Sequence, residues 1–269
     1  MTLSRSSLVL VVLGLVGCAS TEEDPLSWEE FQAQAYREPD TGVYVVNGDE
    51  LAADLDALWV SYEAYRDRVG VGGRYATVEQ PLIVNLVNGR DDRWSSSQAG
   101  NLTYCVSRSS FGSRYNAVVS AMSSAAGAWE GSANVNFVHA SSQDGDCNRR
   151  NGSVVFDVRQ VCIGQYLARA FFPSSSRRNR EVLIDCTSFG NISPYTLAGI
   201  LRHELGHTIG FRHEHTRPEA GVCFEDNNWR ALTLYDSASV MHYPQCNGTN
   251  DGDLVLTSRD RSGARKLYP

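Results

Sequence analysis

The sequence contains no basic run, no internal repeat and no low-complexity tract. Its formal charge is −7 and 20% of its residues are charged, so it lacks the electrostatic footprint of a protein that binds nucleic acid. Hydrophobic residues make up 42% of the chain, which is enough for a core and excludes disorder throughout. We therefore expect a folded protein with no nucleic-acid partner, in one large domain or two small ones.

No Cys-x-x-Cys pair occurs, which argues against a zinc site built from thiolates. The chain has 7 cysteines. Cys18 lies at the end of the apolar N-terminal stretch described below, and an even number of cysteines remains without it. An even number in an exported chain fits three disulfides. Cys223 with Cys246 is the favoured pair and Cys147 with Cys162 is the next, although the sequence does not choose among the possible connectivities.

The apolar stretch at residues 8–16 is too short to cross a bilayer as a permanent helix. It follows Arg5 and ends in Leu15-Val16-Gly17-Cys18, which resembles the lipobox of bacterial lipoproteins. That resemblance implies a signal peptide over residues 1–18, cleavage before Cys18 and a lipid on its thiol. The exported protein would then be held on a membrane surface in the cell envelope. An ordinary signal peptide, followed by secretion, is the alternative.

Residues 89–100 are rich in Ser, Gly and charge, and we place a boundary there, between an N-terminal segment (19–95) and a main domain (96–269). In the first segment, Ser27 and Glu30 form a capping-box pattern, and a second helical pattern follows Asp49. In the main domain, strands alternate with helices. The expected strands are 102–106, 135–138, 154–158, 167–172 and 182–185, and the expected helices are 114–129 and a long one from Ser193-Pro194 through Thr208.

The long helix carries the motif His203-Glu204-x-x-His207-x-x-Gly210-x-x-His213. Residues four apart in a helix lie on the same face, so His203 and His207 can bind one Zn²⁺. Glu204 lies between them and can act as general base on a zinc-activated water. Gly210 permits the sharp turn that brings His213 back as a third ligand. The alternative is that these histidines are ordinary surface or core residues that bind no metal. In that case the whole pattern would have arisen by chance.

This motif, together with a second one, resembles the metzincin metalloproteases. The second motif is Ser239-Val240-Met241-His242-Tyr243. Both motifs are most similar to astacins, and the resemblance covers roughly residues 100–269. It implies that Met241 lies beneath the zinc in a Met-turn and that Tyr243 can ligate zinc and stabilise the tetrahedral intermediate. A buried, hydrogen-bonded core tyrosine is the other interpretation of Tyr243. Glu214 matches an astacin residue that pairs with a new N-terminus after propeptide removal.

Two further segments resemble matrixins. Residues 167–173 are similar to the edge strand that pairs with substrate, and residues 256–268 are similar to the C-terminal helix. The resemblance implies an α+β fold: a twisted mixed sheet with an antiparallel edge strand, a long active-site helix, a Met-turn and a C-terminal helix, preceded by a small, mainly helical N-terminal segment. It also implies a zinc endopeptidase with protein or peptide substrates. A zinc hydrolase of non-peptide amides and a non-catalytic zinc-containing surface protein are the alternatives.

Asp49 has two interpretations. Val46-Asn47-Gly48-Asp49 faintly resembles the astacin propeptide motif, whose Asp occupies the zinc site of the zymogen, so Asp49 would be a switch released by cleavage within 89–100. Local chemistry favours a helix cap after a turn instead. The acidic loops at 144–146 and 250–253 could bind calcium but are more typical of plain turns. The sequence does not indicate the oligomeric state.

Overall fold

The computed structural model describes residues 25–69 and 82–269. The expected signal peptide (1–18) and its Cys18 lie outside the described residues. Within the described part, no helix combines the length and the apolar character that crossing a membrane requires.

The central element is a five-stranded sheet in the order β7-β6-β8-β10-β9. Strands β6, β7, β8 and β10 run parallel, and β9 lies antiparallel to β10 at the edge. Its strands are β6 (Leu102–Val106), β7 (Phe137–His139), β8 (Phe156–Val161), β9 (Ala168–Arg169) and β10 (Glu181–Asp185). The predicted mixed sheet with an antiparallel edge strand is confirmed, although the edge pairing is shorter than the expected 167–172.

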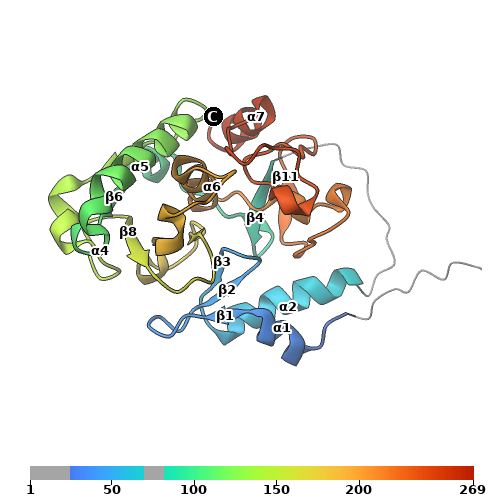
Figure 1. The fold of residues 1–269 in the computed structure, drawn as a ribbon. Helices are drawn as coiled ribbons and strands as arrows, with labels where there is room; N and C mark the ends of the chain where they lie inside the picture. Colours follow the sequence, from blue (N-terminus) through green and yellow to red (C-terminus); the bar gives the residue numbers. More distant parts are fainter. Residues whose placement is uncertain (1–24, 70–81) are drawn as a thin grey trace, which may run out of the picture.

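Helices α5 (Tyr115–Glu130) and α6 (Leu197–Thr208) cover one face of this sheet (Figure 1). Val182 and Ile184 of β10 point toward these helices in the main core, whereas Leu183 points to the opposite face. Trp129 of α5 stacks on Phe211, which follows α6, and its indole nitrogen donates to Arg202 O over 2.8 Å. Helix α6 is thereby fixed against the core.

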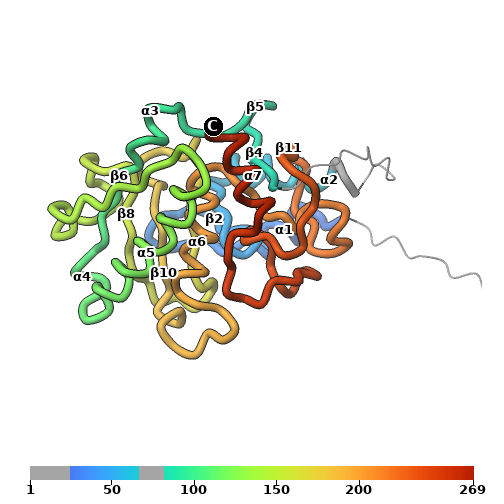
Figure 2. Tube along the Cα trace, turned by 90° about the horizontal axis from the view of Figure 1, so that it is seen from above, coloured from blue at the N-terminus to red at the C-terminus, as the bar shows by residue number. Residues whose placement is uncertain are grey.

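Short elements complete the C-terminal part (Figure 2). Helix α7 (Ser258–Leu267) has Thr257 as its N-cap, and Thr257 and Asp260 form a capping box. The remaining elements are α3 (Ser96–Ala99), α4 (Arg108–Phe111), and a small antiparallel sheet of β4 (Ile83–Val87), β5 (Arg90–Asp91) and β11 (Trp229–Ala231). Since β4 pairs with β11, residues 83–91 pack with the C-terminal part although they precede the expected boundary.

The N-terminal segment contains the two expected helices and, in addition, a three-stranded sheet. Ser27 and Glu30 form the predicted capping box. The elements are α1 (Trp28–Gln34), β1 (Tyr36–Arg37), β2 (Tyr44–Val46), β3 (Glu50–Ala52) and α2 (Leu55–Val69). This small sheet, blue in Figure 1, lies against the face of the main sheet opposite α5, where Val45 packs on Tyr166 and Leu183.

Three local expectations were wrong. Helix α6 is capped by Thr196, whose hydroxyl accepts from Gly199 N over 3.0 Å, and not by Ser193. Asp49 does not cap α2, because that helix begins at Leu55 and Asp54 accepts from Ala57 N at 2.9 Å. Cys147 bonds to Cys105 rather than to Cys162, while the expected bond between Cys223 and Cys246 is present.

Candidate metal centre

Helix α6 presents two imidazoles on one face. Both rings are fixed from behind: His203 Nδ1 lies 2.7 Å from Val240 O, and His207 Nδ1 lies 2.8 Å from Phe211 O. A nitrogen that contacts a carbonyl oxygen must carry the proton, so each Nε2 keeps a free lone pair. The two Nε2 atoms are therefore prepared as ligands before any cation arrives.

The third imidazole arrives after a turn at Gly210, which has φ +96° and would collide with Asp92 O if it carried a Cβ. His213 is fully buried, and its Nδ1 lies 2.6 Å from Glu225 Oε1. Its Nε2 lies 3.2 Å from His203 Nε2. The sequence motif thus places all three predicted ligands at one point.

The atom group at this point includes a carboxylate that belongs to the N-terminal segment. Asp49 Oδ2 lies 3.2 Å from His203 Nε2, and Asp49 Oδ1 lies 3.5 Å from His207 Nε2 and 3.0 Å from His213 Nε2. The four ligand atoms all lie within 4.8 Å of one another. Three imidazole nitrogens and one carboxylate oxygen form a donor set that suits Zn²⁺.

Two observations indicate that a cation fits here. Asp49 Oδ1 and His207 Nε2 are buried and make no hydrogen bond, which leaves two lone pairs directed at the same space. Burial lowers the pKa of His203 to about 4. For His213, burial acts in the same direction, but the charges of Glu225 and Asp49 outweigh it and raise its pKa well above the usual range. The carboxylates of Glu225 and Asp49 thus favour positive charge beside His213, whereas burial keeps His203 neutral and able to act as a ligand.

Glu204 and Tyr243 flank the three histidines. Glu204 is 2% exposed and its Oε2 has no hydrogen-bond partner. Burial, aided by the charge of Asp49, raises the pKa of Glu204 well above its usual value. The Tyr243 ring stacks on His203 at 5.4 Å between centroids, and its hydroxyl donates to Asp49 Oδ2 over 2.5 Å. Tyr243 is thus a buried, hydrogen-bonded tyrosine, but its hydrogen-bond partner is the carboxylate at the centre of the site.

Met241 lies beneath the site. It is fully buried, and a Cβ at Gly206 of α6 would collide with its sulfur. Met241 O accepts from Glu214 N over 2.8 Å, which ties the turn to the segment carrying His213. The predicted turn therefore packs against the helix that bears the ligands.

A hairpin turn carries Asp49 into the site. Asn47 and Gly48 have φ of 56° and 98°, and this turn joins β2 to β3 with Val46 opposite Glu50. A Cβ at Gly48 would lie 3.0 Å from the Tyr243 hydroxyl, so a residue without a side chain is needed for the close approach. The faint motif Val46-Asn47-Gly48-Asp49 thus marks the segment that reaches the histidines.

Two sets of interactions beside the three histidines are not predicted by the sequence. Arg212 Nε and Nη2 donate to the two carboxylate oxygens of Glu50 over 3.0 and 2.9 Å, and Arg212 Nη1 donates to Asp226 over 2.7 Å. Glu225 contacts His213 and also His215, whose Nε2 is 3.1 Å away. These acidic residues occur at no fixed spacing from the motif, and their only signal is the adjacent pair Glu225-Asp226 shortly after it.

An apolar cavity of about 240 Å³ opens beside Glu204. It is lined mainly by Leu167, Ala168, Ile200 and Leu254, and it also reaches Tyr166. Because Ala168 belongs to β9, the cavity lies between the edge strand and the candidate catalytic residues. A peptide lying along β9 could insert an apolar side chain there.

Other predicted positions have structural partners. Asp144 accepts from Val106 N over 2.8 Å and from the Tyr115 hydroxyl, so its carboxylate supports the fold. Glu214 is fully buried; Asp236 N donates to its Oε1 over 3.1 Å, and its Oε2 has no hydrogen-bond partner. Burial raises the pKa of Glu214 well above its usual value.

Comparison with known proteins supports the interpretation of the motifs. Residues 93–220 match the Matrixin family of peptidases, a range that includes the three histidines and Glu204. A bone morphogenetic protein 1 homolog of Strongylocentrotus purpuratus is 37% identical over 90 residues, which are 25% of this chain and 14% of that protein. Human tolloid-like protein 1 is 37% identical over 89 residues, 25% of this chain and 9% of that protein. The match thus spans a small part of these relatives.

Solved structures with a similar arrangement include myroilysin and a hatching enzyme zinc-protease from the medaka Oryzias latipes. Myroilysin has a TM-score of 0.48 and 17% identity, covering 70% of this chain and 98% of its own. The medaka enzyme has a TM-score of 0.40 and 19% identity, covering 64% and 91%. At these low scores, the fold assignment depends on the strands and helices described above.

Proposed function

Since this chain carries a metzincin-type zinc metalloprotease domain, we propose that it is a zinc-dependent endopeptidase produced in a latent form. The observation that carries the proposal is the convergence of His203, His207 and His213 Nε2 on one point, with Glu204 beside it and an edge strand alongside. A strand at the edge of the sheet can pair with an extended peptide, which favours peptide bonds over other amides.

The three histidines would hold the ion, and the protein supplies the groups around it. A zinc ion bound there supplies Lewis-acid chemistry, polarising a carbonyl oxygen and lowering the pKa of water toward neutral. Glu204 removes a proton from the attacking water and then delivers it to the leaving amine.

Tyr243 would stabilise negative charge on the substrate oxygen. Its hydroxyl already donates to a carboxylate oxygen, that of Asp49, in the centre of the site. When a substrate replaces Asp49, the same donor is available to the oxyanion that develops during attack. No covalent bond between enzyme and substrate is needed.

Latency would come from Asp49. Its carboxylate contacts all three histidines, and Glu50 beside it is held by Arg212, so the turn occupies the space that substrate and water need. We propose that residues upstream of Leu82 form a removable propeptide. The expected cleavage within 89–100 is less suitable, because Asp92 and Trp94 are buried and β4 pairs with β11.

We also propose that the chain is exported and anchored to a membrane surface through a lipid on Cys18. Two disulfides, between Cys105 and Cys147 and between Cys223 and Cys246, support an oxidising compartment. The lipobox-like sequence at residues 15–18 supports the anchor. Labelling of wild type but not Cys18→Ser by a radioactive fatty acid would verify it, and equal labelling would contradict it.

Metal analysis and peptide-library cleavage, before and after limited proteolysis, test the enzymatic proposal. We expect about one zinc per chain, cleavage of peptides only after the N-terminal segment is removed, and loss of cleavage with a chelator that is reversed by zinc. A chain that binds zinc but cleaves neither peptides nor denatured protein under any of these conditions would refute the proposal.

A further inference from the structure

A second carboxylate of the N-terminal segment is bound on the outer face of the main sheet. Arg169 of β9 donates from Nε and Nη2 to the two oxygens of Glu38 over 2.6 and 2.8 Å, and the Tyr166 hydroxyl donates to Oε1 over 2.8 Å. The Arg169 side chain is 0% exposed and that of Glu38 is 6% exposed. Burial would raise the pKa of Glu38, but Arg169 outweighs it and holds the pKa below its usual value. This is a complete binding site for an ionised carboxylate.

Glu38 is the main partner of Arg169. The guanidinium also faces Tyr166, and it makes two long hydrogen bonds to Glu181, whose backbone oxygen and Oε2 each lie 3.4 Å away. Glu181 Oε1 is also engaged by Arg159. If Glu38 leaves with the propeptide, a buried guanidinium keeps only long contacts, which is unfavourable unless another carboxylate takes the place.

Arg212 shows the contrast within the same molecule. It holds Glu50 with a similar pair of hydrogen bonds, but it also contacts Asp226 at 2.7 Å and Glu225 at 3.1 Å. Both of these acids belong to the C-terminal part, so Arg212 stays paired when the N-terminal segment is removed. Only the Arg169 site would lose its main counter-charge.

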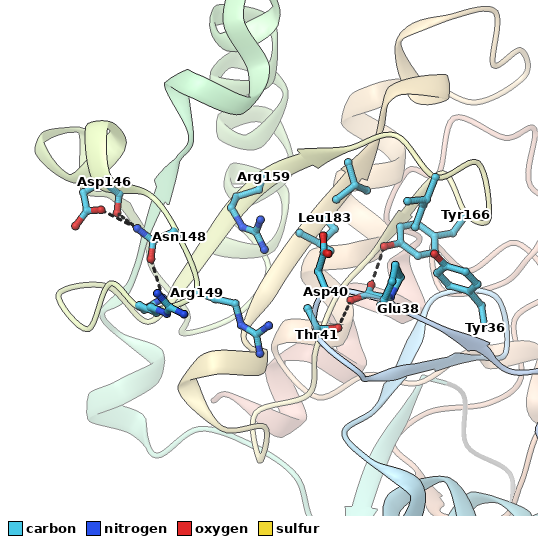
Figure 3. A pocket seen from close by; sticks show the side chains of 14 residues that line it. Tyr36, Glu38, Asp40, Thr41, Asp146, Asn148, Arg149, Arg159, Tyr166 and Leu183 are labelled. Carbon is cyan, nitrogen blue, oxygen red and sulfur yellow. Dashed lines mark hydrogen bonds between the residues drawn. The ribbon is translucent and has the colours of Figure 1, made fainter.

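The Arg169 site adjoins the candidate substrate cleft. Tyr166 lines both the cavity beside Glu38 and the cavity beside Glu204, and Arg169 follows Ala168, which lines the second. Figure 3 shows Glu38 between Thr41 and Tyr166, with Arg149 and Arg159 across a cavity of about 610 Å³. A peptide paired with the free edge of β9 directs alternate side chains to the outer face of the sheet, where this cavity lies.

We infer that Arg169 and Tyr166 form a subsite of the active protease that binds an Asp or Glu side chain of the substrate, and that Glu38 fills it in the latent chain. The inference rests on the proposed function, because the subsite opens only when the N-terminal segment is displaced. The planar fork of Arg169 matches a carboxylate in two parallel hydrogen bonds, and the Tyr166 hydroxyl adds a third donor. An amide would lose the charge and offer only one acceptor oxygen.

The first experiment needs no catalysis. Glu38→Ala in the full chain leaves a carboxylate-sized space, and propionate is used to fill it, with neutral propionamide as the matched probe. We expect propionate, at constant ionic strength, to raise the thermal unfolding temperature of Glu38→Ala but not of wild type, and propionamide to have no effect. Glu50→Ala is the control variant, since Arg212 keeps two acids and propionate should not raise its unfolding temperature. Equal shifts in all three proteins, or equal shifts with both probes, would overturn the carboxylate site.

The second experiment measures selectivity after removal of the N-terminal segment by limited proteolysis. Peptide pairs that differ only by Glu or Gln at one position are compared by kcat/KM. We expect a preference for Glu of about tenfold in kcat/KM at one position. This preference should be lost in Arg169→Lys and reduced in Tyr166→Phe. Because Tyr166→Phe retains the Arg169 guanidinium, it also serves as the test variant if Arg169→Lys folds poorly. Arg149→Gln removes a charge from the same cavity without a contact to Glu38 and should keep the preference.

The outcomes separate the two proposals. If no peptide of any sequence is cleaved, the proposed protease function fails, whatever propionate does. If peptides are cleaved but Glu and Gln partners react equally at every position, the protease function stands and the substrate subsite is refuted.

Discussion

The hydroxyl of Tyr243 donates to Asp49 over 2.5 Å, although 194 positions separate the two residues in the chain. The other carboxylate oxygen of Asp49 lies 3.0 Å from His213 Nε2. One acidic side chain therefore contacts both the histidines that would hold zinc and the hydroxyl that would stabilise the oxyanion. A single residue of the N-terminal segment can occupy the whole reacting centre.

Removal of this carboxylate should activate the uncleaved chain. We expect Asp49→Ala to cleave peptides without processing, at least about tenfold faster than unprocessed wild type, because the fraction of molecules with an open site rises. Asp40→Ala is the control: it removes an exposed acid of the same segment and should leave the chain latent. The measurement is peptide cleavage before any proteolysis, and equal rates for Asp49→Ala and wild type would contradict the switch.

Replacement of Glu204 by Gln separates catalysis from metal binding. Glu204 Oε2 makes no hydrogen bond in the described structure, so Gln fits the same space and leaves the three imidazoles in place. We expect kcat/KM of the processed enzyme to fall by about 10²–10⁴, which is the usual contribution of a general base. Zinc content, measured by mass spectrometry, should stay at that of wild type. An unchanged kcat/KM would refute the assignment of Glu204 as base.

Glu225 should set the zinc affinity through His213. Its Oε1 accepts from His213 Nδ1 over 2.6 Å, which fixes the ring and makes Nε2 a stronger donor. We expect Glu225→Gln to weaken zinc binding by about 10–100-fold, as measured by competition with a chromophoric chelator. Glu219→Gln, which changes an acid with a 45% exposed side chain in the same loop, should bind zinc like wild type. Equal affinities for all three proteins would exclude this positioning role.

The Glu38 site predicts a pH dependence of stability. Arg169 and Tyr166 face the carboxylate, with Thr41 bonded to Oε2 and Glu181 behind the guanidinium. Because the folded-state pKa of Glu38 lies below its ordinary value of 4.5, its stabilising effect is present above that pH and is lost as pH falls through the folded pKa.

The matching variant is Glu38→Gln, which keeps the shape but not the charge. At pH 7 we expect it to unfold with a free energy about 2 kcal/mol lower than wild type, since hydrogen bonds to charged groups contribute in that range. The difference should begin to shrink below about pH 4.5, where the carboxylate of the unfolded chain takes up a proton, and should disappear once the pH falls below the lower folded-state pKa. Urea unfolding at several pH values measures it, and a difference that stays constant from pH 7 to pH 3 would show that charge is not involved.

The parts of the site that the sequence predicted are those encoded by local spacing. His203 and His207 are one helical turn apart, and Gly210 allows the turn to His213, so the ligand geometry follows from a short stretch of chain. The α+β class followed from the metzincin resemblance that these motifs carry. The roles assigned to Glu204, Tyr243 and Met241 stay predictions.

Local sequence patterns do not predict contacts between residues that lie far apart in the chain. Asn47-Gly48 indicates a turn, but nothing near it indicates that its tip reaches histidines far along the chain, and this is why the helix cap was favoured for Asp49. Glu38 and Arg169 are joined by a bond across 131 positions and carry no periodic signal. Such contacts depend on how the N-terminal sheet packs on Tyr166 and Leu183, which only the folded structure reveals.

Cys162 and Cys186 should form the third disulfide of the exported protein. They follow the paired residues Val161 and Asp185 at the ends of parallel strands β8 and β10, which places them side by side. Both are free thiols in the structure, and the hydrogen bond that the Cys186 thiol makes to Cys162 raises the pKa of Cys186. In an oxidising compartment, two adjacent thiols with one exposed are expected to become a disulfide.

Alkylation under denaturing conditions, followed by intact-mass analysis, should then find neither Cys162 nor Cys186 modified unless reductant is added. The free energy of unfolding of the double variant Cys162→Ser/Cys186→Ser should be about 2–4 kcal/mol lower than that of the oxidised parent. It should equal that of the reduced parent. Two alkylated thiols at these positions in protein isolated from the cell envelope would show that the pair stays reduced.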